Sequence, residues 1–194
     1  MRIKNMVTTK KITAGNKTVR SNRNLFQCTS GVAAVEFALV GPIFLALVFS
    51  LFETGLLYTK IALTDNAVAD VSRSIYVGAA QSDGSVTSDT LKEDICDSIF
   101  IVQDCLNNIT IEVTTISDFN SIPTGGEICQ DSFDSGPPPA TTYSPGASSQ
   151  ISFVRVCVTT KIITPFLGLG LKLTKNANNR FEIISTLAFV NEPF

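Results

Sequence analysis

One apolar run, from Val32 to Phe52, limits what this chain can fold into more than any other feature, and Glu36 is its only charged side chain. At about 1.5 Å per residue, a helix over this run would be roughly 31 Å long, which is close to the hydrocarbon thickness of a bilayer. Secretory signals have shorter apolar cores, and residues 51–55 (Leu-Phe-Glu-Thr-Gly) make a poor small-x-small cleavage site. We therefore predict a transmembrane helix that stays with the mature protein.

Charge is divided sharply between the two sides of this run. Residues 1–31 contain seven Lys or Arg and no Asp or Glu, a charge of +7, whereas residues 32–194 contain eight against seventeen, a charge of −9. A basic segment before a membrane helix stays in the cytoplasm by the positive-inside rule, which places the acidic remainder in the periplasm. An acidic outer domain offers nucleic acid no attractive surface, so we interpret the basic arm as a retention signal and expect no nucleic-acid partner.

The helix is predicted to continue beyond the bilayer. Mostly apolar positions recur every three or four residues after the run, which is the period of one helix face, and Gly78 offers a stop. Gly41-Pro42 lies inside the run, where membrane helices tolerate proline. A helix over residues 32–75 would be about 66 Å long, and we interpret its second half as packing against a soluble domain rather than binding a partner. The stripe consists of Leu57, Ile61, Thr64, Val68, Val71 and Ile75.

The C-terminal part has the pattern of a small domain with mixed secondary structure. Thr90 and Glu93 have the spacing of a capping box and predict a short helix over about residues 91–102. Residues 117–150 are rich in Gly, Pro, Ser and Asp and predict a long loop. Alternating or β-branched segments predict three strands, at residues 109–114, 151–163 and 181–190.

The predicted fold class is therefore α+β. A long N-terminal transmembrane and spine helix is followed by a small disulfide-containing periplasmic domain of about three strands and a short helix. The parts are a basic cytoplasmic leader (1–31), the transmembrane and amphipathic spine helix (32–75) and the periplasmic domain (76–194). We interpret the acidic residues of segment 85–135 as solvated loop, and Arg155 and Lys161 as surface charges in or near a strand.

The cysteines are also divided by the apolar run. Cys28 lies in the leader, on the reducing cytoplasmic side, while four cysteines lie in the oxidising space. Four cysteines predict two disulfides in one of three connectivities, with Cys129 holding the long loop to the core. The chain has no histidine and no Cys-x-x-Cys pair, so no metal site is predicted. The disulfide candidates are Cys96, Cys105, Cys129 and Cys157.

Residues 31–37 (Gly-Val-Ala-Ala-Val-Glu-Phe) stand between the basic leader and the apolar helix. In this position they resemble the processing site of type IV prepilins. The resemblance implies that a prepilin peptidase cuts on the cytoplasmic side between Gly31 and Val32, which makes Glu36 the fifth residue of the mature chain. Flp-type pilins often have tyrosine after this glutamate, so Phe37 is a small departure from the pattern.

Cleavage would expose an ammonium group at Val32, and the resemblance implies that this group pairs with Glu36 of a neighbouring subunit. A carboxylate at the centre of a membrane helix costs roughly 3 kcal/mol. Two unit charges about 4 Å apart attract by about 4 kcal/mol at an effective dielectric constant of about 20, so pairing would offset that cost and favour assembly. The alternative places Glu36 at the cytoplasmic headgroup boundary of an uncleaved anchor, where its cost is small.

The wider pattern resembles the TadE-like family of pilin-like proteins in tight-adherence (Flp, type IVc) pilus systems. The resemblance is clearest over residues 31–55, where residues 33–42 (Ala-Ala-Val-Glu-Phe-Ala-Leu-Val-Gly-Pro) are typical of the start of the family, and residues 191–194 (Asn-Glu-Pro-Phe) echo it. It implies a single-pass minor pilin or pseudopilin of the bacterial inner membrane that serves pilus assembly, adhesion and biofilm formation. The implied partners are the prepilin peptidase, other pilin-like subunits and inner-membrane pilus assembly proteins.

Two other functions compete with this interpretation. An uncleaved single-pass protein that acts as a binding or adhesion module would have the same anchor. A periplasmic hydrolase would need a catalytic site, but the sequence has neither histidine nor a Gly-x-Ser-x-Gly motif. We therefore predict no enzyme activity, no catalytic residues and no cofactor.

Overall fold

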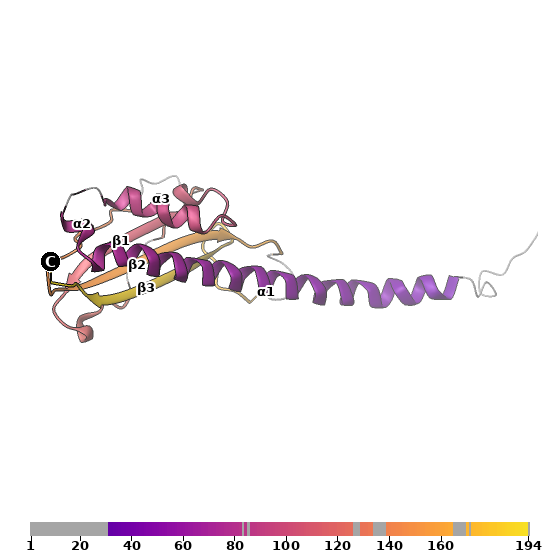
Figure 1. The fold of residues 1–194 in the computed structure, drawn as a ribbon. Coiled ribbons are helices and arrows are strands. Elements are labelled where there is room, and N and C mark those ends of the chain that lie inside the picture. The colour runs from indigo at the N-terminus through magenta and orange to yellow at the C-terminus, as the bar shows by residue number, and fades with distance from the viewer. Residues whose placement is uncertain are drawn as a thin grey trace, which may run out of the picture. The chain divides into compact units, whose positions relative to one another are not determined.

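The structure is a computed structural model that describes residues 31–82, 84, 86–125, 129–133, 139–164, 170 and 172–193. Of the predicted leader only Gly31 is among the described residues, so Cys28 lies outside them. The chain divides into two units, Met1–Gly41 and Pro42–Phe194, and each is described by itself. The first contributes the start of helix α1, and the second holds the remainder of that helix and the sheet domain (Figure 1).

Helix α1 runs from Val32 to Tyr76, within one residue of its predicted end. Pro42 lies inside the helix and does not end it. The helix stops where the Gly78 N–H donates to the carbonyl of Ile75 at 3.1 Å. Gly78 has a φ of 83°, a left-handed conformation that glycine adopts without steric cost, so this residue ends the helix as predicted.

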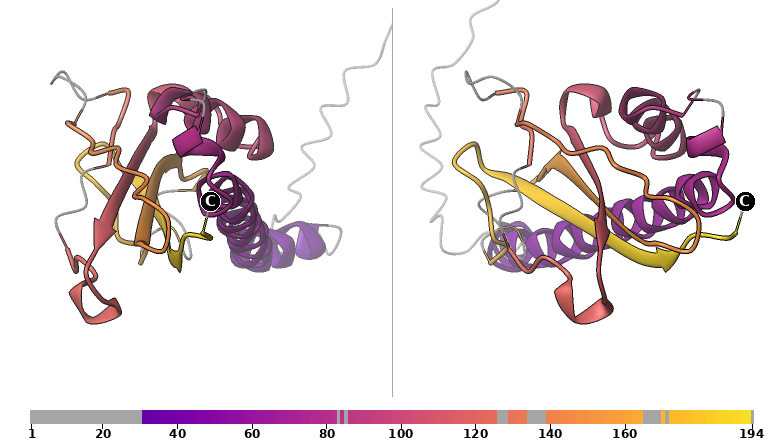
Figure 2. Two further views of the ribbon diagram at one scale, coloured as in Figure 1. Left: turned by 60° about the vertical axis from the view of Figure 1, so that its left-hand side comes forward. Right: turned by 90° about the vertical axis from the view of Figure 1, so that its left-hand side faces the viewer.

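The hydrophobic core lies between one face of the sheet and two helices, α1 and α3 (Ser88–Ser98), which Figure 2 shows on the same side of the sheet. The predicted stripe of α1 is the face that packs there. Its members Leu57, Thr64, Val68, Val71 and Ile75 are buried, and Ile61 is half-buried. The interpretation of this stripe as domain packing is therefore confirmed.

The sheet has the three predicted strands, which are antiparallel and lie in the order β1-β2-β3. The central strand pairs Val158 with Ile109 on one side, and its last residue Lys161 with Arg180 on the other. Val154, Val156 and Val158 point to the core, as their alternation predicts. The strands are β1 (Ile109–Ile116), β2 (Ile151–Lys161) and β3 (Arg180–Val190).

The opposite face of the sheet is covered by the long connection between β1 and β2. Cys129 of this connection forms a disulfide with Cys157 of β2, so the predicted attachment of the loop to the core is confirmed. Arg155 lies on the same face, where it is only 8% exposed and its Nε donates to Glu112 at 2.9 Å. The prediction that Arg155 is a surface charge is therefore wrong, because the loop shields the face on which it lies.

Helix α3 begins three residues before its predicted start. Thr87 is the N-cap, its hydroxyl accepts from the Thr90 N–H at 3.3 Å, and the Thr90 hydroxyl accepts from the Thr87 N–H at 2.8 Å. The predicted capping box of Thr90 and Glu93 is therefore one turn too late. The apolar face is confirmed, since Leu91, Ile95 and Ile99 are buried. Short helical segments α2 (Ala79–Ser82), η3 (Cys105–Asn107) and η4 (Phe119–Ser121) complete the described elements.

Candidate functional site

The predicted cleavage bond lies at the very start of the long helix. Val32 is the first residue of α1 and is 52% exposed, and Gly31 directly before it is also exposed. A Cβ atom built on Gly31 would meet nothing within 4 Å. Packing among the described residues therefore does not require glycine at this position. Access of another protein to the backbone is a reason for glycine here.

Glu36 lies one helical turn after Val32, on the same face of α1. It is exposed, and among the described residues no hydrogen bond or ion pair is recorded for its carboxylate. The structure thus presents a carboxylate that is free to meet a cation from outside the described part of the chain.

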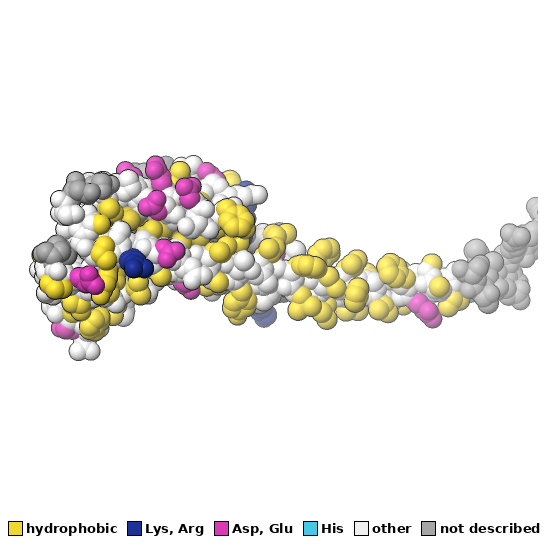
Figure 3. Space-filling view, in the orientation of Figure 1, with side chains coloured by type: hydrophobic (Ala, Val, Ile, Leu, Met, Phe, Trp, Pro, Cys, Tyr) yellow, Lys and Arg dark blue, Asp and Glu magenta, His cyan; other side chains and the backbone are white. Residues whose placement is uncertain are grey.

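Most side chains of the apolar run are exposed, and Figure 3 shows hydrophobic side chains along this part of α1. Of the helices in the described residues, α1 alone is long and apolar enough to cross a membrane, and little of its most apolar stretch is buried. A helix that is apolar all around and unburied in its own domain fits a single-pass membrane anchor. The most exposed members are Val35, Phe37, Leu39, Val40, Ile43, Phe44, Leu51 and Phe52.

Glu53 follows this run directly, and its side chain is only 6% exposed. Its carboxylate accepts hydrogen bonds from the backbone N–H groups of Ile163, at 3.0 Å, and Thr164, at 2.9 Å. The Thr164 hydroxyl donates a further bond at 3.2 Å. Glu53 therefore holds the chain beyond β2 against the first turn of α1 after the predicted bilayer.

Lys60 makes a second connection between α1 and β2. Its Nζ atom donates to the hydroxyl of Thr160 at 2.8 Å. Burial lowers the pKa of Lys60 below its ordinary value, and the charge of Glu53 partly opposes that shift. Next to it lies a cavity of about 310 Å³ whose lining includes Leu56, Ile101 and Ile163.

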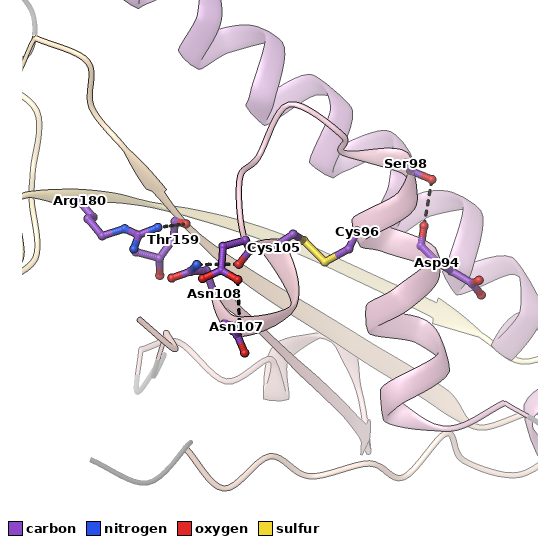
Figure 4. Close-up of a disulfide and its surroundings, with 9 residues drawn as sticks. Asp94, Cys96, Ser98, Cys105, Asn107, Asn108, Thr159 and Arg180 are labelled. Atoms are coloured by element: carbon purple, nitrogen blue, oxygen red, sulfur yellow. Dashed lines mark hydrogen bonds between the residues drawn. A yellow bond between two sulfur atoms is a disulfide. The ribbon is translucent and has the colours of Figure 1, made fainter. Parts of the chain in front are cut away.

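The four cysteines that follow α1 form two disulfides, which resolves the three connectivities that the sequence leaves open. Cys96 of α3 pairs with Cys105, and Cys129 pairs with Cys157. Figure 4 shows the first of these beside Asn108, whose side-chain N–H donates to the Asp104 carbonyl at 2.7 Å. The bridges attach α3 to the turn before β1, and the long loop to the central strand.

Asp131 is buried in the same loop and forms an ion pair that spans 49 positions of sequence. It is 4% exposed, and its Oδ1 atom accepts from Nη1 of the equally buried Arg180 at 3.1 Å. The Phe133 backbone N–H donates to Oδ1, and the side chains of Asn176 and Asn178 donate to Oδ2. The interpretation of all acidic residues in 85–135 as solvated is therefore wrong for this residue.

Burial alone would raise the pKa of the Asp131 carboxyl. The hydrogen bonds from Phe133, Asn176 and Asn178, together with the charge of Arg180, outweigh burial and hold this pKa below its ordinary value. Asp131 is therefore charged in the folded protein. Its partners lie on the strand β3 and on the connection before it, so the pair fixes the loop to the sheet.

Sequence reasoning missed Glu53 and the pair of Asp131 with Arg180. Glu53 had one signal, its position as the first charge after the apolar run, but its partner Ile163 is 110 positions away. Among the described residues there is no group of three or more His, Cys, Asp or Glu side chains that could hold a metal ion. The described residues therefore offer a membrane anchor, the exposed carboxylate of Glu36 and a disulfide-linked domain.

Comparison with known proteins gives one match. Residues 31–73 match a family model described as TadE-like protein. No curated protein and no solved structure matches the chain. The matched segment lies almost wholly within α1, includes Gly31, Val32 and Glu36, and ends before the sheet domain. The resemblance seen in the sequence is therefore confirmed over this segment, and the long N-terminal helix of the chain is similar to that of TadE-like proteins.

Proposed function

We propose that the protein is a membrane-anchored, pilin-like minor subunit, a pseudopilin, that serves the assembly of a tight-adherence pilus. The observation that carries this proposal is the match of residues 31–73, because that segment contains both the predicted processing site and an exposed apolar helix. The subunit crosses the bacterial inner membrane once. Its leader is cytoplasmic and its disulfide-linked sheet domain is periplasmic, as the charge on the two sides of the helix favours.

In this proposal the prepilin peptidase removes residues 1–31, and the subunit then contacts other pilin-like subunits and inner-membrane assembly proteins. The exposed start of α1 supports it, since a peptidase must reach the bond between Gly31 and Val32. The role is one of assembly and adhesion, including biofilm formation, and not of catalysis. An uncleaved membrane-anchored binding module is the competing function.

Processing can be tested by the intact mass and N-terminal sequence of the full chain purified from membranes that contain an active prepilin peptidase. The expected product starts at Val32. Gly31→Leu should retain the leader, because a bulky side chain blocks close approach of the backbone to the peptidase. Gly55→Leu is the matched control, since Gly55 lies on α1 with equally open space around its Cα, and this variant should be processed normally. Retention of residues 1–31 in the unaltered chain would favour the uncleaved binding module.

Glu36→Gln should leave processing intact and lower co-assembly with other pilin-like subunits at least tenfold. A tenfold change in binding corresponds to about 1.4 kcal/mol of binding free energy. This is a minor part of the attraction expected between Glu36 and a Val32 amine. The measurement is the yield of crosslinked or co-purified subunits from membranes. Asp70→Asn removes an exposed carboxylate from the same helix outside the apolar run and serves as the control. Equal assembly of both variants would refute charge pairing and leave cleavage untouched.

A further inference from the structure

The end of the sheet domain next to the apolar run has an exposed surface that α1 does not cover. We define the membrane-facing patch as Leu56, Phe100, Ile101, Phe133, Lys161 and Ile163. Phe100 is 78% exposed, Ile163 is 65% exposed and Phe133 is 63% exposed. Leu56, Ile101 and Ile163 line one cavity, and Nζ of Lys161 lies 5.8 Å from the centroid of the Phe133 ring.

The position of this patch along α1 is fixed by Glu53. The carboxylate of Glu53 holds the Ile163 backbone N–H at 3.0 Å, and Glu53 directly follows Phe52, the last residue of the apolar run. If the run fills the hydrocarbon layer, Ile163 lies at its boundary. Leu56 lies three residues after Glu53, a rise of about 4.5 Å, whereas the headgroup region on each side of a bilayer is about 5–8 Å thick. Leu56 and Ile163 therefore lie at the level of the lipid headgroups.

The chemistry of the patch fits a phospholipid surface. Aromatic side chains are enriched where a membrane meets water, and lysine can place its apolar stem in the interface and its ammonium at the phosphates. The patch contains one exposed lysine and no acidic residue, although residues 32–194 carry a net charge of −9 from eight Lys or Arg against seventeen Asp or Glu. Figure 3 shows hydrophobic side chains where α1 leaves the domain.

We propose that the membrane-facing patch rests on the phospholipid surface of the bilayer that α1 crosses, with its apolar side chains in the interface and Lys161 directed to lipid phosphates. The inference depends on the membrane anchor in the proposed function. It adds a second contact with the membrane, which fixes the orientation of the sheet domain above the bilayer. The same contact holds the subunit in the membrane until assembly draws it out.

Tryptophan fluorescence can test the patch, because the chain has no tryptophan. The full chain is placed in vesicles of phosphatidylcholine and phosphatidylglycerol, with lipids brominated near the headgroup end of the acyl chains as quenchers. Ile163→Trp reports on the patch. Phe44→Trp reports on the anchor, since Phe44 lies in the apolar run and is 62% exposed.

Phe119→Trp is the matched control, because Phe119 is an exposed aromatic residue at the other end of the domain. It follows β1, whose last residue Ile116 pairs with Ile151. Ile151 is ten positions along β2 from Lys161, a distance of about 33 Å in an extended strand. A tryptophan at position 119 therefore lies far from any membrane that the patch contacts.

We expect bromolipids to quench the tryptophan at position 163 at least threefold more strongly than the one at position 119. Adding Lys161→Glu to the position-163 variant should reduce that quenching about twofold. If the tryptophan at position 44 is quenched but the one at position 163 is quenched no more than the control at position 119, the inference is overturned and the anchor stands. A tryptophan at position 163 that shifts to the blue with rising protein-to-lipid ratio, without bromolipid quenching, would show that a second copy covers the patch and would also overturn it. Absence of quenching at position 44 would reject the anchor itself.

Discussion

Asp131→Ala should lower the free energy of unfolding by about 3–5 kcal/mol, because it leaves the charge of Arg180 buried without a counter-charge. The two residues are each 4% exposed, and their closest charged atoms are 3.1 Å apart. The change also removes an acceptor from the Phe133 backbone N–H and from two asparagine side chains. Denaturant unfolding of the full chain in detergent measures the loss.

The double variant Asp131→Ala with Arg180→Met is the informative control. Removing both charges leaves no unpaired ion, so the double variant should lose less free energy of unfolding than Asp131→Ala alone. Asp118→Ala removes an exposed aspartate that caps η4 through the Asn120 N–H, and it should cost about 1 kcal/mol or less. A double variant less stable than the single one would contradict the unpaired-charge explanation.

The same pair predicts how stability depends on pH. The pKa of Asp131 is lowered in the folded protein, so the unfolded chain binds more protons near its ordinary carboxyl pKa of about 3.9. The stabilisation from Asp131 is therefore fully present above that value and is lost as pH falls through the lower folded-state pKa. Thermal unfolding between pH 6 and pH 3 should show a steeper acid decline for the unaltered protein than for Asp131→Asn. Parallel curves would contradict this account.

Removing the Cys129–Cys157 disulfide should destabilise the domain more than removing Cys96–Cys105. The first bridge closes a sequence separation of 28, and the second closes a separation of 9. The chain-entropy model gives losses of about 3.6 and about 2.6 kcal/mol respectively, since a longer loop gains more freedom in the unfolded chain. The variants Cys129→Ser with Cys157→Ala, and Cys96→Ser with Cys105→Ala, avoid new free thiols.

Unfolding midpoints of these two double variants, measured in the same detergent without reductant, check the order. The first bridge also holds the loop over the sheet face that contains Arg155, so its loss should expose that side chain to solvent. Faster proteolysis within 117–150 in the first variant alone would agree with this effect. The opposite order of stability would show that the loop is held mainly by its hydrogen bonds to Asn108 and Thr110.

The elements of this fold could be predicted because their signals are local. The stripe from Leu57 to Ile75 and the alternation around Val156 each repeat within a few residues, so the helix face and the core face of β2 follow directly. The cap of α3 was misplaced because Thr90 and Glu93 match the common pattern, whereas the actual partners are two threonines. The predicted processing residues Gly31, Val32 and Glu36 also form a local motif, and their role stays a prediction.

The buried charges could not be predicted, because their environment is made by distant segments. Arg155 alternates with valines that face the core, which places it on the other face of the sheet. Whether that face meets water depends on residues 117–150, whose composition is typical of a solvated loop. Asp131 lies in that loop, and only the three-dimensional pairing with Arg180 distinguishes it from its exposed neighbours.

The hydrogen bonds that Glu53 and Lys60 make at the end of β2 have a mechanical consequence. Figure 1 shows β2 lying obliquely across the part of α1 that packs on the sheet. A pull along this helix, such as extraction from a membrane would apply, passes through the Glu53 and Lys60 hydrogen bonds into the central strand. That strand is paired to β3 along its whole length and to β1 from Ile151 to Val158, and it is linked covalently to the long loop. The load is therefore shared by many bonds at once, and the domain follows its helix as a single body.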